Sequence, residues 1–132
     1  MSYSTITEIE HKLFCRSYST LMSELRLDPN LSRALDSIET NRGWISPVAL
    51  AKAAGLSRTV LSGRLRERTG FSPHQFLIRR RILEAAQLIL STDFSLLEIA
   101  LSVGFRDMNG LDRNFKLLLA MTPRDLRKSG QA

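Results

Sequence analysis

Apolar residues recur every three or four positions along most of the chain, which is the spacing of one face of an α-helix. Runs of alternating apolar and polar residues, which would indicate β-strands, are nearly absent. The pattern therefore predicts an all-α fold of about seven helices, with one further helix over residues 5–26. We expect the seven over 30–41, 47–54, 57–69, 73–90, 95–104 and 107–119, with a short last one after Thr122.

Helix-capping residues support these boundaries. A serine or threonine lies at the start of each of five predicted helices. Its side-chain oxygen can accept a hydrogen bond from the free backbone N–H groups of the first turn, which favours a helix start there. These residues are Ser46, Ser57, Ser72, Ser95 and Thr122. Two of them are followed three residues later by Gln75 or Glu98, which completes a capping box. Glycines at 55, 70 and 104 mark helix ends where a positive φ is expected.

The chain contains an internal repeat. Residues 46, 50, 51 and 55 recur 49 positions later as Ser95, Ile99, Ala100 and Gly104, and a similar series from Leu61 to Pro73 recurs 50 positions later. Each copy consists of a helix, a turn with glycine and a second helix, which is the helix-turn-helix layout. In such units the second helix lies in the major groove of DNA, so the pattern points to a DNA-binding protein.

Charge singles out one part of this repeat. The chain of 132 residues has a net charge of +6. Residues 57–81 contain seven arginines and one glutamate, and both flanking segments are neutral. This basic window (residues 57–81) includes the second helix of the first copy. Arginine binds phosphate and guanine edges with its planar fork, so motif and charge agree on a nucleic-acid partner.

Other chemistries find little support. Cys15 is the sole cysteine, which excludes an internal disulfide and is typical of a reducing compartment. His11 and His74 stand apart from acidic or cysteine clusters, so we expect no metal site and no cofactor. No apolar run is long enough to span a membrane, and the N-terminus does not have the layout of a signal peptide. A DNA-repair methyl acceptor would need further reactive or zinc-binding cysteines, so we expect no enzyme.

Several short motifs resemble the AraC/XylS family of bacterial transcription regulators. The second copy carries Ala100-x-x-Val103-Gly104-Phe105-x-Asp107, Arg113-x-Phe115-Lys116 and Thr122-Pro123-x-x-x-Arg127. The first copy agrees through Leu50-Ala51, Gly55-Leu56-Ser57, Leu61 and Thr69-Gly70-Phe71-Ser72-Pro73, and the linker through Arg81, Ala85 and Leu88. The resemblance covers about residues 30–128.

The resemblance implies two homeodomain-like helix-turn-helix subdomains, 29–72 and 92–132, joined by a rigid linker helix over 73–91. Residues 1–28 would be an N-terminal extension, helical or flexible, too short for the family's effector domain. The chain would then be a stand-alone activator in the bacterial cytoplasm, at the nucleoid, controlled by its own abundance. As a monomer or weak dimer it would bind an asymmetric double-stranded site of roughly 20 base pairs and contact RNA polymerase.

Family positions that meet bases correspond here to Thr59, Ser62, Gly63, Met108, Asn109, Gly110 and Arg113. Six basic residues are expected to contact phosphate, namely Arg58, Arg64, Arg66, Lys116, Arg79 and Arg80. For Arg79 and Arg80, RNA polymerase is an alternative partner. Arg81 is expected to bridge the two subdomains. For Arg58, Arg64, Arg66 and Lys116 the alternative is a solvated helix face. Arg113 has the alternative of an ion pair with Asp107 or Asp112, and Met108 that of packing.

Three residues depart from the family pattern, two in the first copy and one at the end of the helix before Thr122. Gly63 replaces the usual arginine of the first reading helix, Leu65 replaces a phenylalanine, and Ala120 replaces a glycine that ends a helix. Gly63 removes a base-reading side chain. The second copy is therefore expected to carry most of the sequence discrimination, while the first binds the DNA backbone. An alternative function is a protein-binding antagonist of transcription with weak or non-specific DNA binding.

The expected core consists of Leu50, Leu56, Leu61, Leu65, Ile99, Val103, Phe105, Leu111 and Phe115, with Trp44 and Phe76 added as packing residues, not base-stacking ones.

Overall fold

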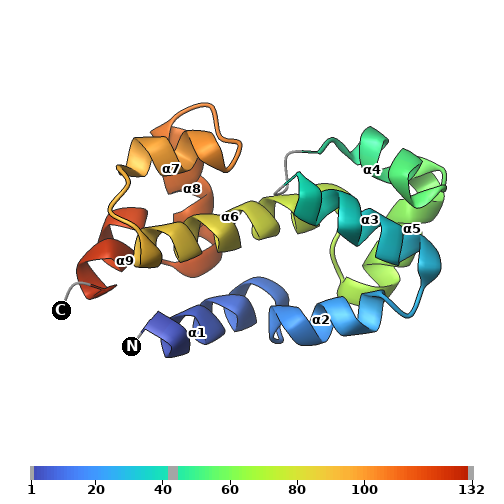
Figure 1. Cartoon of the computed structure of the whole chain (residues 1–132), viewed down its shortest axis with the longest axis horizontal. Coiled ribbons are helices and arrows are strands. Elements are labelled where there is room, and N and C mark those ends of the chain that lie inside the picture. The colour runs from blue at the N-terminus through green and yellow to red at the C-terminus, as the bar shows by residue number, and fades with distance from the viewer. Residues whose placement is uncertain (1, 42–44, 131–132) are drawn as a thin grey trace.

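In the computed structural model, which describes residues 2–41 and 45–130, the described part of the chain contains nine α-helices and no strand (Figure 1). The helices are α1 (Ser2–Phe14), α2 (Tyr18–Leu25), α3 (Pro29–Thr40), α4 (Pro47–Ala54), α5 (Arg58–Thr69), α6 (Pro73–Ser91), α7 (Leu96–Ser102), α8 (Met108–Leu119) and α9 (Pro123–Gly130). The predicted all-α class is confirmed, and α3 to α9 match the seven helices expected from the sequence.

The long helix α6 is the axis of an elongated molecule (Figure 1). Helices α3, α4 and α5 gather at its N-terminal end, and α7, α8 and α9 at its C-terminal end. We call these two groups the first module (α3–α5) and the second module (α7–α9). No helix in the described part of the chain is both long enough and apolar enough to cross a membrane.

The two modules share the same turn. In the first, the N–H of Leu56 donates to the carbonyl of Ala51 over 3.0 Å, and Gly55 has a φ of 73°. In the second, the N–H of Phe105 donates to the carbonyl of Ala100 over 2.9 Å, and Gly104 has a φ of 101°. Both alanines are buried, which allows the two helices of each unit to approach closely. The predicted helix-turn-helix geometry is confirmed in both copies.

The predicted caps and core are largely observed. All five predicted N-cap side chains accept a hydrogen bond from the first turn of their helix. The predicted core residues are buried with one exception, since Leu56 is only partly buried against the core. Phe76 is fully buried, as expected for a packing residue. The other aromatic residue expected in the core, Trp44, lies outside the described residues.

The single helix expected over 5–26 is wrong, because two helices occupy this segment. Helix α1 ends at Phe14, and Cys15 adopts a left-handed φ of 62°. Ser17 then caps α2 by accepting a hydrogen bond from the N–H of Thr20 over 3.2 Å. The left-handed residue and the extended N-cap interrupt the helix, so α2 begins on a new axis and continues from α1 toward the first module (Figure 1).

Ala120 ends α8 in the left-handed conformation that glycine adopts more readily. Its φ is 58°, and its N–H donates to the carbonyl of Lys116 over 2.9 Å. The left-handed strain of an alanine exceeds the extra backbone entropy that glycine loses on folding. We therefore expect Ala120→Gly to raise the free energy of unfolding by about 0.5–1 kcal/mol. Urea denaturation followed by circular dichroism measures it, and an unchanged or lower stability would contradict the expectation.

Candidate nucleic-acid interface

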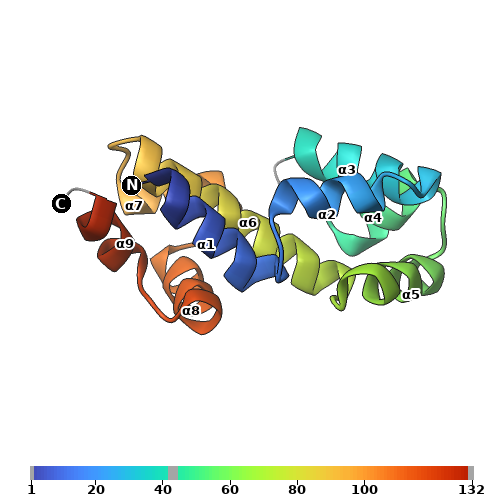
Figure 2. The same ribbon diagram turned by 90° about the horizontal axis from the view of Figure 1, so that it is seen from below.

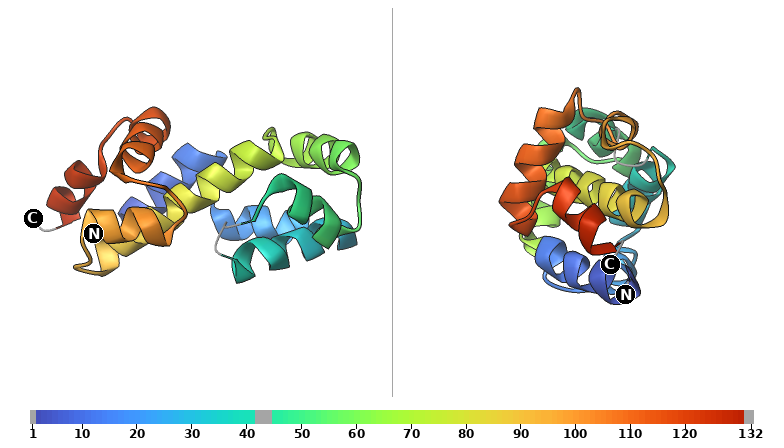
Figure 3. Two further views of the ribbon diagram at one scale, coloured as in Figure 1. Left: turned by 90° about the horizontal axis from the view of Figure 1, so that it is seen from above. Right: turned by 90° about the vertical axis from the view of Figure 1, so that its left-hand side faces the viewer.

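The second helix of each helix-turn-helix unit lies on the same side of α6. Figures 2 and 3 show α5 and α8 along one edge of the molecule, while α3 and α7 lie toward the other. Ser57 caps α5 and Asp107 caps α8, the latter by accepting a hydrogen bond from the N–H of Gly110 over 3.1 Å. This arrangement presents two helices to one extended ligand.

Helix α8 presents a polar face to solvent. Asn109, Arg113 and Lys116 follow one another at helical spacing, and all three are exposed. None of them forms an ion pair or side-chain hydrogen bond with any residue that the structure describes. The alternative of an ion pair for Arg113 with Asp107 or Asp112 therefore finds no support in the geometry. These side chains are available to a ligand, whereas Met108 is half-buried against the core.

Helix α5 presents the matching face with smaller side chains. Thr59, Ser62, Gly63 and Arg66 occupy the same helical register, 50 positions before the residues of α8. Thr59 and Arg66 are exposed, and Ser62 is half-exposed. Where α8 carries Arg113, α5 carries Gly63, so its centre lacks a long donor. This face can contact a thymine methyl or a base edge at close range, but it cannot reach far into a groove.

The two glycines assigned to base reading have different surroundings. A Cβ built on Gly63 would have no heavy atom within 4 Å beyond its chain neighbours and the backbone of its own helix, so this position is open space. A Cβ on Gly110 would lie 3.2 Å from Cδ1 of Phe105, so a side chain there would press against the ring of Phe105 at the turn. Position 63 therefore faces open space and lacks a side chain on the exposed surface of α5. Position 110 instead packs against Phe105 within the second module.

This difference predicts opposite effects of one substitution. Gly63→Ala is expected to stabilise the protein by about 1 kcal/mol, because alanine favours the helix interior over glycine and meets no neighbour. Gly110→Ala serves as the matched comparison and is expected to destabilise, since Phe105 must move to accept the new methyl group. Thermal unfolding of the two variants beside the parent protein measures both effects. A destabilised Gly63→Ala protein would contradict the open environment seen here.

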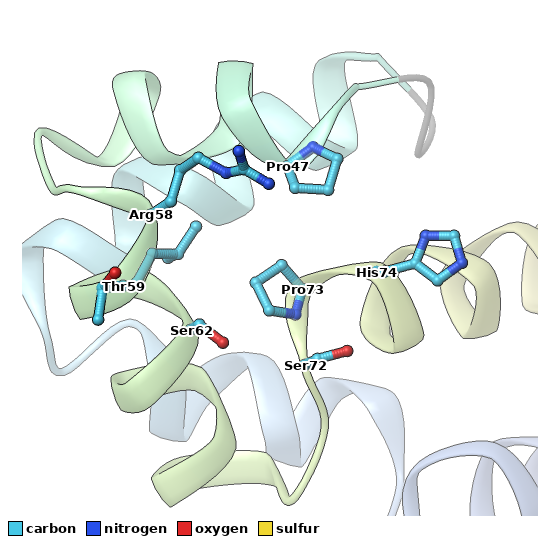
Figure 4. Close-up of a pocket in the computed structure, with 8 residues that line it drawn as sticks. Pro47, Arg58, Thr59, Ser62, Ser72, Pro73 and His74 are labelled. Atoms are coloured by element: carbon cyan, nitrogen blue, oxygen red, sulfur yellow. The ribbon is translucent and has the colours of Figure 1, made fainter.

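Two grooves flank the reading helices. The first lies between α5 and the N-terminal ends of α4 and α6, as Figure 4 shows. It is lined by Pro47, Arg58, Thr59, Leu61, Ser62, Ser72, Pro73 and His74. The second lies between α6 and the N-terminal end of α8, and it is lined by His74, Ile78, Arg81, Gly104, Phe105, Arg106, Asp107, Asn109, Gly110, Arg113 and Asn114.

Sequence reasoning missed two exposed groups on this surface. His74 lines both grooves and therefore lies between the two reading helices. Arg106 lies in the turn before α8 and is exposed. The position of Arg106, two residues after the turn glycine and two before α8, could have identified it as a basic residue next to a reading helix. His74 gave no such signal, because only the fold brings the two grooves together on either side of it. Among the described residues, no cluster of His, Cys, Asp and Glu could hold a metal ion.

Arg80 corrects one of the phosphate expectations. Its side chain is buried, with 7% of the residue exposed. Nε and Nη2 donate to the two carboxylate oxygens of Glu39 over 2.9 and 3.1 Å, and Nη2 lies 3.1 Å from Glu84. Burial opposes its charge, but the hydrogen bonds to Glu39 together with the negative charges of Glu39 and Glu84 raise the pKa of Arg80. Arg80 therefore joins α6 to α3 and does not face a ligand.

Two other arginines of the basic window also make contacts within the protein. Nη1 of Arg64 donates to Asn30 over 3.1 Å and to Asp28 over 3.3 Å, which attaches α5 to the start of α3. Burial of Asp28 opposes its ionised form, but the N–H groups of Leu31 and Asn30, together with Arg64, lower its pKa. The guanidinium of Arg79 lies 4.2 Å from the ring centre of Phe71.

The basic window is therefore not one exposed patch. Arg81 is half-buried, and burial lowers its pKa. Arg58, Arg66 and Arg68 remain exposed, and none of their side chains forms a hydrogen bond or ion pair with a described residue.

Comparisons with known proteins agree with this geometry. Residues 50–129 match the family model described as a helix-turn-helix domain. Over 81 residues the chain is 37% identical to the HTH-type transcriptional regulator MtrA of Neisseria gonorrhoeae, covering 61% of this chain and 27% of that protein. Over 84 residues it is 34% identical to the HTH-type transcriptional activator RhaS of Salmonella arizonae, covering 64% of this chain and 30% of that protein. The chain thus spans less than a third of these relatives.

Solved structures show the same fold. An AraC-type transcriptional regulator from Chromobacterium violaceum superposes with a TM-score of 0.73 at 26% identity, over 77% of this chain and 92% of that one. The DNA-binding domain of AdpA, solved in complex with a target DNA, superposes with a TM-score of 0.70 at 31% identity, over the same shares of the two chains.

Proposed function

Because the chain belongs to the AraC-type helix-turn-helix family, we propose that it is a transcription regulator that places α5 and α8 in successive major-groove segments of one double-stranded DNA site. The observation that carries this proposal is the position of the two reading helices on one side of α6. Asn109 and Arg113 on α8 are exposed and form no ion pair or side-chain hydrogen bond with any residue that the structure describes. The structural likeness to a domain bound to its target DNA supports it.

The length of α6 fits two adjacent groove segments. A helix of 19 residues spans about 28 Å, and successive major-groove segments on one face of DNA lie about 34 Å apart. Reading helices at the two ends of such a linker can reach neighbouring segments without a second protein molecule. This geometry supports binding as a monomer to one asymmetric site.

The two modules are proposed to contribute unequally. In the second module, Asn109 can bind adenine and Arg113 guanine through two hydrogen bonds each, so α8 would supply most of the sequence discrimination. In the first module, Thr59 and Ser62 reach only nearby edges, and Gly63 reaches none. Exposed basic side chains on both helices would neutralise phosphates and supply affinity without discrimination. They are Arg58, Arg66 and Lys116.

Selection of duplexes from a random DNA pool, followed by footprinting, tests the proposal. We expect one continuous, asymmetric protected site of roughly 20 base pairs, with base preferences strongest in the half that contacts α8. The affinity should fall with rising salt, because bound phosphates release counterions. Failure to enrich any sequence at low salt would overturn the proposal.

Activation through RNA polymerase is the effect on transcription that we propose. The similarity to RhaS, which is named a transcriptional activator, supports this choice over repression. Such a regulator would act on the bacterial chromosome, in the cytoplasm. Transcription in vitro from a promoter carrying the selected site, with purified polymerase, measures the direction of the effect. Reduced transcription on addition of the protein would overturn activation while leaving DNA binding intact.

A protein-binding antagonist of transcription remains the second candidate, and one observation favours it. The first reading helix lacks a long side chain at Gly63, and its neighbour Arg64 is held by Asp28 and Asn30. An antagonist would bind polymerase or another regulator while binding all DNA sequences equally. The random-pool selection separates the two functions, because only a sequence-specific regulator enriches a defined site.

A further inference from the structure

Helices α1 and α2 precede the segment matched by the family model, which begins at residue 50, and they contact both modules. We infer that this pair, the α1–α2 brace, fixes the distance and angle between the two reading helices and thereby selects DNA sites by the spacing of their halves. The inference rests on the proposed function and adds to it a determinant of specificity that does not touch DNA.

One end of the brace is attached to the second module. Helix α1 packs against both α6 and α8, and Figure 2 shows it lying along α6 next to α8. Ile9 and Leu13, one helical turn apart, are 3% and 0% exposed, and Ile6 is partly buried one turn earlier. The opposite face of α1, with His11 and Lys12, is exposed. Helix α1 therefore buries a continuous apolar stripe against the half of the protein that contains α8.

The middle of the brace is an aromatic cluster at the junction of α5 and α6. The ring of Phe14 lies 5.1 Å from Tyr18, 5.5 Å from Phe76 and 6.4 Å from Phe71, measured between centroids. Phe71 lies between α5 and α6, and Phe76 lies in the first turns of α6. Aromatic pairs at these distances stabilise beyond the apolar area that they bury. The cluster fixes the point where the first reading helix joins the linker helix.

The other end of the brace is attached to the first module. Helix α2 packs against α3, and the hydroxyl of Tyr18 donates to Glu39 over 2.8 Å. Glu39 in turn accepts from Arg80 of α6. Nη2 of Arg16 donates to the carbonyl of Arg68, near the end of α5, over 3.4 Å. The brace is thus joined to α3, α5, α6 and α8 by both apolar and polar contacts.

The modules otherwise meet mainly through α6. Within the described part of the chain, the well-packed pairs of helices include none that joins α3–α5 directly to α7–α9. Without the brace, bending at the N-terminal end of α6 would change the separation of α5 and α8. With it, the two helices are held in one arrangement. One inserted base pair turns the second half-site by about 35° and moves it by about 3.4 Å, which a rigid protein cannot follow.

A distance measurement without DNA tests the brace. Spin labels are placed at the exposed positions 52 in α4 and 117 in α8, in a Cys15→Ser background, and their separation is measured by pulsed electron resonance. We expect one narrow distance distribution. Ile9→Asp introduces a charge beneath α1 and should broaden it. His11→Asp adds the same charge on the exposed face and should leave it narrow.

Ile6→Asp, at a partly buried position, should broaden the distribution less, and it provides a second test if Ile9→Asp does not fold. Circular dichroism establishes that each variant measured keeps its helices. A folded Ile9→Asp or Ile6→Asp protein with the narrow distribution of the parent would overturn the inference.

Binding to spacing variants tests the consequence for specificity. The probe is the duplex selected from the random pool, with one or two base pairs inserted between its halves. We expect the parent and His11→Asp to lose at least about tenfold in affinity per insertion, and Ile9→Asp to lose less than about threefold. Equal losses for all three proteins would overturn the inference, whereas a parent protein that selects no site would instead overturn the proposed function.

Discussion

Arg80→Ala is expected to lower the free energy of unfolding by about 3 kcal/mol, the lower end of the range for removing one member of a buried ion pair. The substitution leaves the carboxylates of Glu39 and Glu84 without their shared partner in a site where water replaces it poorly. The lower end applies because the side chain of Glu39 is still 32% exposed. For a chain of this size the loss corresponds to a fall in Tm of about 10 °C.

A matched arginine provides the control for Arg80. Arg66→Ala removes the same side chain from an exposed position on α5, where it has no partner among the described residues, and should change stability by less than about 0.5 kcal/mol. A double-mutant cycle with Glu39→Gln then isolates the coupling between Arg80 and Glu39. Equal effects of the two arginine substitutions would show that the ion pair contributes nothing to folding.

The ion pair between Arg80 and Glu39 makes the free energy of unfolding depend on pH in the acid range. Burial opposes the ionised form of Glu39, but the hydrogen bond and positive charge of Arg80, together with the hydrogen bond from Tyr18, lower the pKa of Glu39. This contribution to stability is complete above the pKa of an unfolded glutamate, about 4.3, and is lost as the pH falls through the lower pKa of the folded state. In Arg80→Ala the loss of stability on acidification should be smaller. The free energies of unfolding of the parent and the variant should therefore converge as the pH falls.

Local sequence signals accounted for most of the fold. The five N-caps, the glycines of both turns and the small residues Ala51 and Ala100 act within a few positions of themselves, and the structure shows each in its expected role. The break within residues 5–26 was missed because the apolar spacing continues across it. The signal that was present is Ser17, whose side chain caps a helix that periodicity alone does not delimit.

The charge of the basic window indicated the class of ligand, but it did not indicate which arginines are exposed to that ligand. The arginines of the basic window are adjacent along the chain, but α6 turns about 100° per residue and sends neighbouring side chains in different directions. Arg80 therefore points inward to Glu39, an acidic residue 41 positions earlier, which no local pattern could reveal. The family resemblance was the better guide, because it compares equivalent positions. It singled out Arg113, and this residue is exposed and unpaired among the described residues.

Arg113→Ala is expected to remove discrimination at one base position of the DNA site, by about 1–3 kcal/mol. In the parent protein the guanidinium can form two hydrogen bonds with one guanine, which no other base accepts equally well. The variant should therefore bind the selected site about 5- to 150-fold more weakly while binding site variants at that one position almost as before. Competition binding with duplexes changed at each position in turn measures the effect.

Lys116→Ala is the control that distinguishes a base contact of Arg113 from a phosphate contact. Both side chains are exposed on the same face of α8, and both substitutions remove one positive charge. A phosphate contact has no base preference, so Lys116→Ala should weaken binding to all duplexes alike and reduce the slope of log affinity against log salt by about 0.9. If Arg113→Ala behaves in the same way, Arg113 also binds phosphate. Discrimination by α8 would then have to come from Asn109, since Gly110 has no side chain and Met108 is half-buried.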